Sequence, residues 1–83
     1  MVKIVEKTDE FVKTIKKIKD FASKEKIEKQ VRKILENPEV GNPMMYARKG
    51  TRETYLAPFR ISYAYVQAED KVIFLDIYHK DEQ

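Results

Sequence analysis

The chain has 83 residues, which is the size of one domain, so we treat residues 1–83 as a single unit. It contains no cysteine and one histidine, which excludes disulfides, a thiolate nucleophile and a structural zinc site, and we expect neither a metal nor a cofactor. The net charge is only +3 although 37% of the residues are charged, a balance typical of proteins from hot environments. The sequence has no long apolar run and no signal peptide, so we expect a cytoplasmic protein without a membrane segment.

The N-terminal half predicts one short strand followed by two helices. Residues 2–6 alternate between apolar and polar side chains, as a strand does, and Thr8 then offers a helix cap followed by two acidic residues. The apolar residues of the first helix recur at helical spacing: Phe11, Ile15, Ile18 and Ala22. Ser23 is the expected cap of the second helix, which ends at Asn37 because a proline follows. The connection is so short that the helices should form an antiparallel hairpin whose apolar stripes cover a sheet.

The C-terminal half changes to a period of two, which predicts strands. We expect them at residues 52–56, 59–66 and 71–78, with a short additional one at 44–47. The turns between them are short, so consecutive strands should pair as an antiparallel meander. The predicted fold class is therefore α+β: an antiparallel sheet of three to five strands in the order β-α-α-β-β-β, with the N-terminal helical hairpin packed on one of its faces.

The strand at 59–66 places an arginine among small residues. Its bulky side chains alternate to one face, which should meet the helices: Phe59, Ile61, Tyr63 and Tyr65. Arg60 then lies on the open face of the sheet, beside Ser62 and Ala64. Small neighbours leave room around the guanidinium, which suits a phosphate, although an arginine on an exposed strand is more often simply solvated.

A basic segment precedes this strand. Arg48, Lys49 and Arg52 lie within five positions, around Gly50 and close to Tyr46. Exposed cations beside an aromatic ring suit single-stranded RNA, whose phosphates pair with arginine and whose bases stack. A solvated basic hairpin is the alternative interpretation of the same residues.

The alternation of the last strand places His79 and Lys80 on different faces. We expect the helices to cover its more apolar face, which consists of Ile73, Leu75 and Ile77. The open face then carries Val72, Phe74, Asp76 and Tyr78. Tyr78 and Lys80 therefore share the face of Arg60, whereas His79 points toward the helices unless the strand ends before it.

Four segments follow one another in a recognisable order, namely NPEVGNPM, RKGTRE, FRISYAY and IYH. Together with the β-α-α-β-β-β order, they resemble the RelE/ParE superfamily of type II toxins over nearly the whole chain. The most specific part is residues 59–63, which are similar to the aromatic-Arg-aliphatic-x-Tyr strand of that family.

RelE-type members of this superfamily are metal-independent, ribosome-dependent endoribonucleases that cut mRNA in the ribosomal A site and are neutralised by an antitoxin. The resemblance therefore implies an mRNA interferase whose partners are the ribosome, mRNA and a RelB-type antitoxin. Two alternatives stay open: a ParE-type inhibitor of DNA gyrase, and a degenerate member that binds its antitoxin but no longer cuts.

The resemblance also implies roles for individual residues. Arg60 matches the mid-sheet arginine of the family, which stabilises the phosphate in the transition state. Glu53 is a candidate general base, since some members use a glutamate, and Tyr78 is a candidate RNA contact. The basic residues at the positions where RelE members hold RNA are Arg48, Lys49 and Arg52.

The C-terminus leaves the general acid open. RelE proper has a basic residue after the last strand, a place that Lys80 takes here, but the given chain ends before the tyrosine that follows it in RelE. The YoeB branch ends its last strand in Tyr-His-Tyr, with the histidine as general acid, and Tyr78 and His79 match the first two of these. His79 as an acid and Lys80 as a charge stabiliser are therefore competing predictions.

Overall fold

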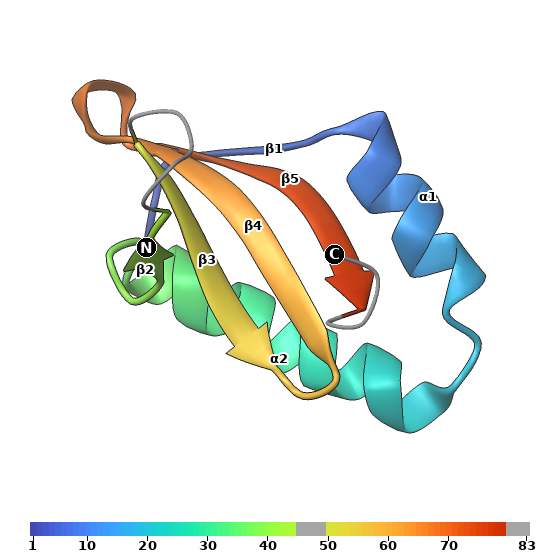
Figure 1. Ribbon diagram of the computed structural model, residues 1–83. Helices are drawn as coiled ribbons and strands as arrows, with labels where there is room; N and C mark the ends of the chain where they lie inside the picture. The colour runs from blue at the N-terminus through green and yellow to red at the C-terminus, as the bar shows by residue number, and fades with distance from the viewer. Residues whose placement is uncertain (45–49, 80–83) are drawn as a thin grey trace.

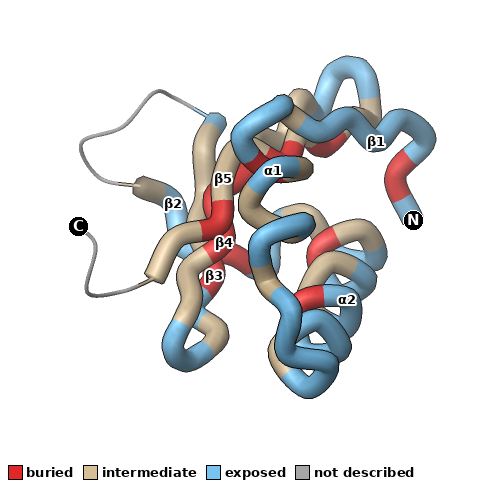
Figure 2. The backbone as a smooth tube through the Cα atoms, turned by 90° about the vertical axis from the view of Figure 1, so that its right-hand side faces the viewer, coloured by how far each residue is buried: buried red, intermediate tan, exposed pale blue. Residues whose placement is uncertain are grey.

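The computed structural model describes residues 1–44 and 50–79, which form two helices and a five-stranded sheet. The elements are β1 (Ile4–Lys7), α1 (Asp9–Lys17), α2 (Phe21–Glu36), β2 (Asn42–Pro43), β3 (Thr51–Leu56), β4 (Phe59–Val66), the 3₁₀ turn η1 (Gln67–Glu69) and β5 (Lys71–His79). Both helices lie on one face of the sheet, and no described helix covers the other, which we call the open face (Figure 1, Figure 2). This arrangement confirms the predicted α+β fold class.

The sheet is mixed rather than wholly antiparallel, because β1 joins it at an edge. The strand order is β1-β5-β4-β3-β2, and β1 runs parallel to β5, with Ile4 opposite Lys71 and Lys7 opposite Phe74 (Figure 1). The other neighbouring strands are antiparallel, as expected from their short turns. No local turn fixes the direction of β1, so its parallel pairing follows only from the folded structure. The short strand predicted at 44–47 lies, apart from Met44, outside the described residues.

The caps of the two helices differ in how well the sequence predicts them. Thr8 caps α1 as expected: its hydroxyl oxygen accepts the backbone N–H of Phe11 at 3.1 Å and donates to the carbonyl of Leu75 in β5 at 2.6 Å. The predicted cap of α2 is wrong, because Asp20 caps it instead, and Ser23 donates to that carboxylate from its backbone N–H and from its hydroxyl. These hydrogen bonds lower the pKa of Asp20, since they favour its charged form.

The core lies between the helices and the central strands. Its buried residues are Val2, Phe11, Ile27, Ile34, Ile61, Tyr63, Val72, Phe74 and Ile77. Phe11 of α1 stacks on Phe74 of β5 with 5.1 Å between the ring centroids, which fixes the helix against the strand. Neither helix of the described chain is long and apolar enough to cross a membrane.

A bulge in β5 reverses the predicted faces of the first half of that strand. Ser62 pairs with Asp76, whereas the next residue, Tyr63, pairs with Phe74, so Leu75 is an extra residue without a partner in the ladder. Before the bulge, Val72 and Phe74 are the residues buried toward the helices, and the prediction for them was wrong. After the bulge the predicted alternation holds, and Tyr78 lies opposite Arg60.

Candidate active site

Three neighbouring strands bring Glu53, Arg60 and Tyr78 together on the open face. Arg60 of β4 pairs with Tyr78 of β5, and Glu53 reaches them from β3. The Arg60 guanidinium donates from Nη1 to Glu53 Oε1 at 2.9 Å, and the Tyr78 hydroxyl donates to Glu53 Oε2. We call these three residues the Glu53 cluster. A group whose pKa is shifted by burial and by a charged neighbour marks a candidate functional site, and Tyr78 of this cluster is such a group.

Tyr78 is a neutral hydrogen-bond donor in this cluster. Burial first, and then the hydrogen bond and the negative charge of Glu53, raise the pKa of Tyr78 from 10.0 to about 12. Arg60 opposes this rise, and Asp76 adds to it. Because the folded protein holds the phenolic proton more tightly, this contribution to stability is fully present below pH 10 and is lost as the pH rises toward 12.

The exchange of Glu53 for glutamine should lower the pKa of Tyr78 without returning it to 10.0. The variant removes the negative charge but leaves the burial, which is the larger cause of the shift. Tyrosinate absorbance, measured against Tyr78→Phe to isolate this residue, reports the change. An identical titration of Tyr78 in the wild type and the variant would show that the carboxylate does not contact the phenol in solution.

Arg60 keeps donors that the described residues do not use. Its Nε is buried and has no hydrogen-bond partner among the described residues, while its side chain is 34% exposed. A buried donor without a partner costs free energy unless a ligand completes it. A phosphate oxygen matches the fork geometry of the guanidinium, so the arrangement suits an RNA backbone.

Tyr55 is a residue of this site that the sequence analysis missed. It lies opposite Arg60 in the β3–β4 pair, its ring centroid is 5.8 Å from the Arg60 Cζ, and the residue is 56% exposed. An exposed aromatic ring beside an arginine is a surface on which a nucleobase can stack. Strand alternation could have identified it, because Tyr55 follows Glu53 by two positions and therefore lies on the same face of β3.

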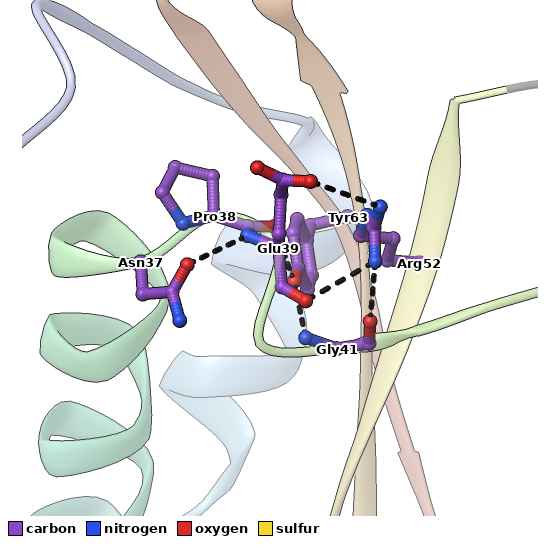
Figure 3. Close-up of polar contacts among 6 residues, drawn as sticks. All are labelled: Asn37, Pro38, Glu39, Gly41, Arg52 and Tyr63. Atoms are coloured by element: carbon purple, nitrogen blue, oxygen red, sulfur yellow. Dashed lines mark hydrogen bonds and ion pairs between the residues drawn. The ribbon is translucent and has the colours of Figure 1, made fainter.

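Arg52 is not part of the Glu53 cluster. It pairs with Tyr63 on the helix side of the sheet, and its Nη1 donates to the carbonyls of Glu39 at 3.1 Å and Gly41 at 2.8 Å (Figure 3). The Glu39 carboxylate lies 3.9 Å from Nη2. Arg52 therefore holds the loop that follows α2, and its predicted role in RNA binding stays a prediction.

The Tyr63 hydroxyl holds the same loop from inside the core. It donates to the carbonyl of Pro38 at 2.8 Å and accepts the backbone N–H of Gly41 at 2.9 Å (Figure 3). A side chain at Gly41 would not fit, since its Cβ would lie 2.6 Å from the hydroxyl oxygen. The loop between α2 and β2 is thus fixed to β4 by one phenol and to β3 by one guanidinium.

Replacement of Tyr63 by phenylalanine should destabilise the protein by about 1–3 kcal/mol, because the variant leaves a backbone N–H and a carbonyl without their partner. Urea unfolding followed by circular dichroism measures the loss. The matched control is Tyr65→Phe, whose hydroxyl makes no hydrogen bond to a described residue, and it should change stability by less than about 0.5 kcal/mol. Equal losses in both variants would contradict the role of the Tyr63 hydroxyl.

His79 faces the helices, as the strand alternation predicted. Its ring meets Phe59 edge-on with 5.9 Å between centroids, and it lines a cleft of about 260 Å³ with Thr14 and Lys17 of α1. It is therefore separated from Arg60 by the thickness of the sheet. Three other predicted site residues, Arg48, Lys49 and Lys80, lie outside the described residues. Within the described ranges, no three acidic or histidine side chains gather as metal ligands would.

Solved structures of toxins share this fold. The intact E. coli RelBE toxin–antitoxin complex contains a chain with a TM-score of 0.78 at 14% identity, over 92% of this chain and 94% of that one. The archaeal RelE–RelB complex from Pyrococcus horikoshii OT3 matches with a TM-score of 0.77 at 12% identity, over 100% of both chains. The RelBE2 toxin–antitoxin complex from Mycobacterium tuberculosis matches with a TM-score of 0.75 at 20% identity, over 95% of this chain and 99% of that one. Identities this low show the fold alone.

The family comparison covers almost the whole chain. No curated protein matches the sequence. The family model of the ParE toxin of the type II toxin–antitoxin system parDE matches residues 5–83. With the RelE-like fold, this match confirms the resemblance drawn from the four sequence segments. The chain is thus a type II toxin of the RelE/ParE superfamily and belongs to the ParE toxin family.

Proposed function

We propose that this toxin is a ribosome-dependent endoribonuclease that cuts mRNA in the A site. The observation that carries the proposal is the Arg60 guanidinium, whose buried Nε lacks a partner among the described residues, beside the carboxylate of Glu53. A cation with a free donor and an adjacent proton acceptor are the groups that metal-free cleavage of a phosphodiester needs. A gyrase inhibitor has no evident need for this pair.

The proposed reaction uses the 2′-hydroxyl of the RNA as its nucleophile. Glu53 accepts the 2′-hydroxyl proton, the 2′-oxygen forms a bond to phosphorus, and the bond from phosphorus to the 5′-oxygen breaks. Arg60 stabilises the charge that develops on the phosphate oxygens. The leaving 5′-oxygen takes a proton from a general acid. His79 lies on the opposite face of the sheet from Arg60, so of the two predicted candidates we favour Lys80, which strand alternation predicts on the face of Arg60. The products are a 2′,3′-cyclic phosphate and a 5′-hydroxyl.

We further propose that a RelB-type antitoxin neutralises this activity. The structural neighbours from E. coli, Pyrococcus horikoshii and Mycobacterium tuberculosis were solved as toxin–antitoxin complexes, which supports such a partner. On this chain, the open face carries the Glu53 cluster, so an antitoxin segment laid across it would exclude RNA.

A ParE-type inhibitor of DNA gyrase is the second candidate, and the family model that matches the chain favours it. The two functions need different targets, so two assays on the same protein decide between them. In a translating extract, we expect ribosome-dependent cuts within codons, mapped by primer extension. In a supercoiling assay with purified gyrase, we expect no inhibition. Intact mRNA in the first assay overturns the nuclease proposal, and inhibition in the second then establishes the alternative.

A further inference from the structure

The two carboxylate oxygens of Glu53 have separate partners in the folded protein. Oε1 accepts from Arg60 and Oε2 accepts from Tyr78, and the side chain of Glu53 is only 20% exposed. The partners come from strands on the same side of β3, since β4 and β5 follow it in the sheet. The carboxylate is therefore held at both oxygens, and the oxygen that faces Arg60 is not available as a base.

An arriving phosphate competes with Glu53 for Arg60. Arg60 Nε is buried while Nη1 contacts Glu53, so the guanidinium must turn out of that contact before it can present Nε and one Nη to two phosphate oxygens. It then reaches the bidentate geometry that arginine favours. Phosphate and carboxylate are both negative, so they repel each other when both lie against one cation. Binding of the phosphate therefore replaces the Arg60 contact to Oε1, while the Tyr78 contact to Oε2 is unaffected by the exchange.

From this geometry we infer that Glu53 and Arg60 block each other until a phosphate arrives, and that Tyr78 is the positioning residue that then holds Glu53 in place. The inference rests on the proposed function. Arg60 moves from Oε1 to the phosphate, and the freed Oε1 becomes the oxygen that accepts the 2′-hydroxyl proton. Tyr78 keeps Oε2, so the carboxylate stays against the sheet instead of turning away from the new negative charge.

The other charged groups around Tyr78 do not compete for this contact. The groups that act on it are Glu53 from β3, Arg60 from β4 and Asp76 from its own strand. Asp76 accepts the backbone N–H of Ile77 at 2.8 Å, so this carboxylate has its own donor. The Tyr78 phenol stays protonated across the pH range of a cleavage assay, because its pKa is raised to about 12.

The first test measures binding of inorganic phosphate to the free toxin, without ribosomes. Phosphate titrations followed by the NMR signal of the Arg60 Nε–H should show tighter binding to Glu53→Gln than to the wild type. We expect roughly a tenfold gain, the size of one competing charged hydrogen bond. Tyr78→Phe should bind phosphate like the wild type, because Arg60 is unchanged. Equal affinity of Glu53→Gln and the wild type overturns the mutual block.

The second test measures kcat and KM of mRNA cleavage by Tyr78→Phe. We expect kcat to fall by about tenfold with KM unchanged, because the variant removes the hydrogen bond that keeps the carboxylate in position once Arg60 has turned to the phosphate. The control Tyr65→Phe removes a phenolic hydroxyl on the helix side of the sheet and should leave both constants unchanged. A raised KM with an unchanged kcat would overturn the positioning role.

The two tests separate this inference from the proposed function. A toxin that cuts mRNA but shows neither the tighter phosphate binding of Glu53→Gln nor the lower kcat of Tyr78→Phe keeps the nuclease function and overturns the inference. A toxin that cuts no mRNA overturns the nuclease function, while the phosphate titration still decides whether Glu53 and Arg60 block each other.

Discussion

Replacement of Arg60 by alanine should reduce ribosome-dependent mRNA cleavage by about 10²–10³-fold, the usual loss when one group that stabilises a developing oxyanion is removed. Arg60 is the cation of the Glu53 cluster, and Glu53 would then be a carboxylate without its ion pair beside a negatively charged substrate. Single-turnover cleavage on programmed ribosomes measures the effect. Near-wild-type cleavage by this variant would remove Arg60 from the mechanism.

Two further variants show whether the activity lost in Arg60→Ala is due to the missing guanidinium donors, to the missing positive charge or to unfolding. Arg60→Lys keeps the positive charge but loses the fork of donors, so it should recover only part of the activity. Arg32→Ala makes the same deletion on the exposed surface of α2, on the helix side of the sheet, and should cleave like the wild type. Circular dichroism of all three variants shows whether any loss comes from unfolding.

The sequence predicts most of this fold because its local signals agree with its long-range contacts. Thr8 caps α1 as its position suggests, and the short turns give antiparallel pairing of β3, β4 and β5. The resemblance then selects the superfamily from motif order, which neither periodicity nor composition could do. Those parts of the fold depend on neighbours in sequence, where a single chain carries its clearest information.

The parts of the fold that the sequence does not predict depend on contacts between residues far apart in the chain. Both alternating sets of β5 are apolar in its first half, so the sequence does not say which set meets the helices, and the bulge at Leu75 decides. Arg52 is an RNA-binding candidate by composition, yet the structure joins it to carbonyls of residues 39 and 41, which no motif encodes. Charge in a sequence indicates a cation, but only the fold shows what it contacts.

For the candidate site as well, the sequence indicates the residue types and the fold shows which of them are in contact. Arg60, Glu53 and Tyr78 were each singled out from the sequence, and the structure places them in contact although their positions span three strands. His79 was the more conspicuous residue as the only histidine, and it lies on the opposite face. Strand alternation anticipated this separation because the bulge precedes residue 76, leaving the last residues of β5 in the predicted phase.

Replacement of Phe74 by alanine should have the largest effect on stability, a loss of about 3–5 kcal/mol. The residue is 0% exposed, stacks on Phe11 and lies 6.3 Å from the ring of Tyr63, centroid to centroid. Small domains have a net stability of only about 5–15 kcal/mol, so the variant should unfold at much lower urea concentration. Urea unfolding monitored by circular dichroism gives the difference.

The control for this variant is Phe21→Ala, which deletes the same ring from a residue that is 77% exposed at the start of α2 and should cost less than about 0.5 kcal/mol. The comparison also tests the bulge. With unbroken alternation through β5, Phe74 would lie on the open face and its deletion would cost little. A small loss for Phe74→Ala would therefore contradict both the core position of this ring and the register shift that places Tyr78 beside Arg60.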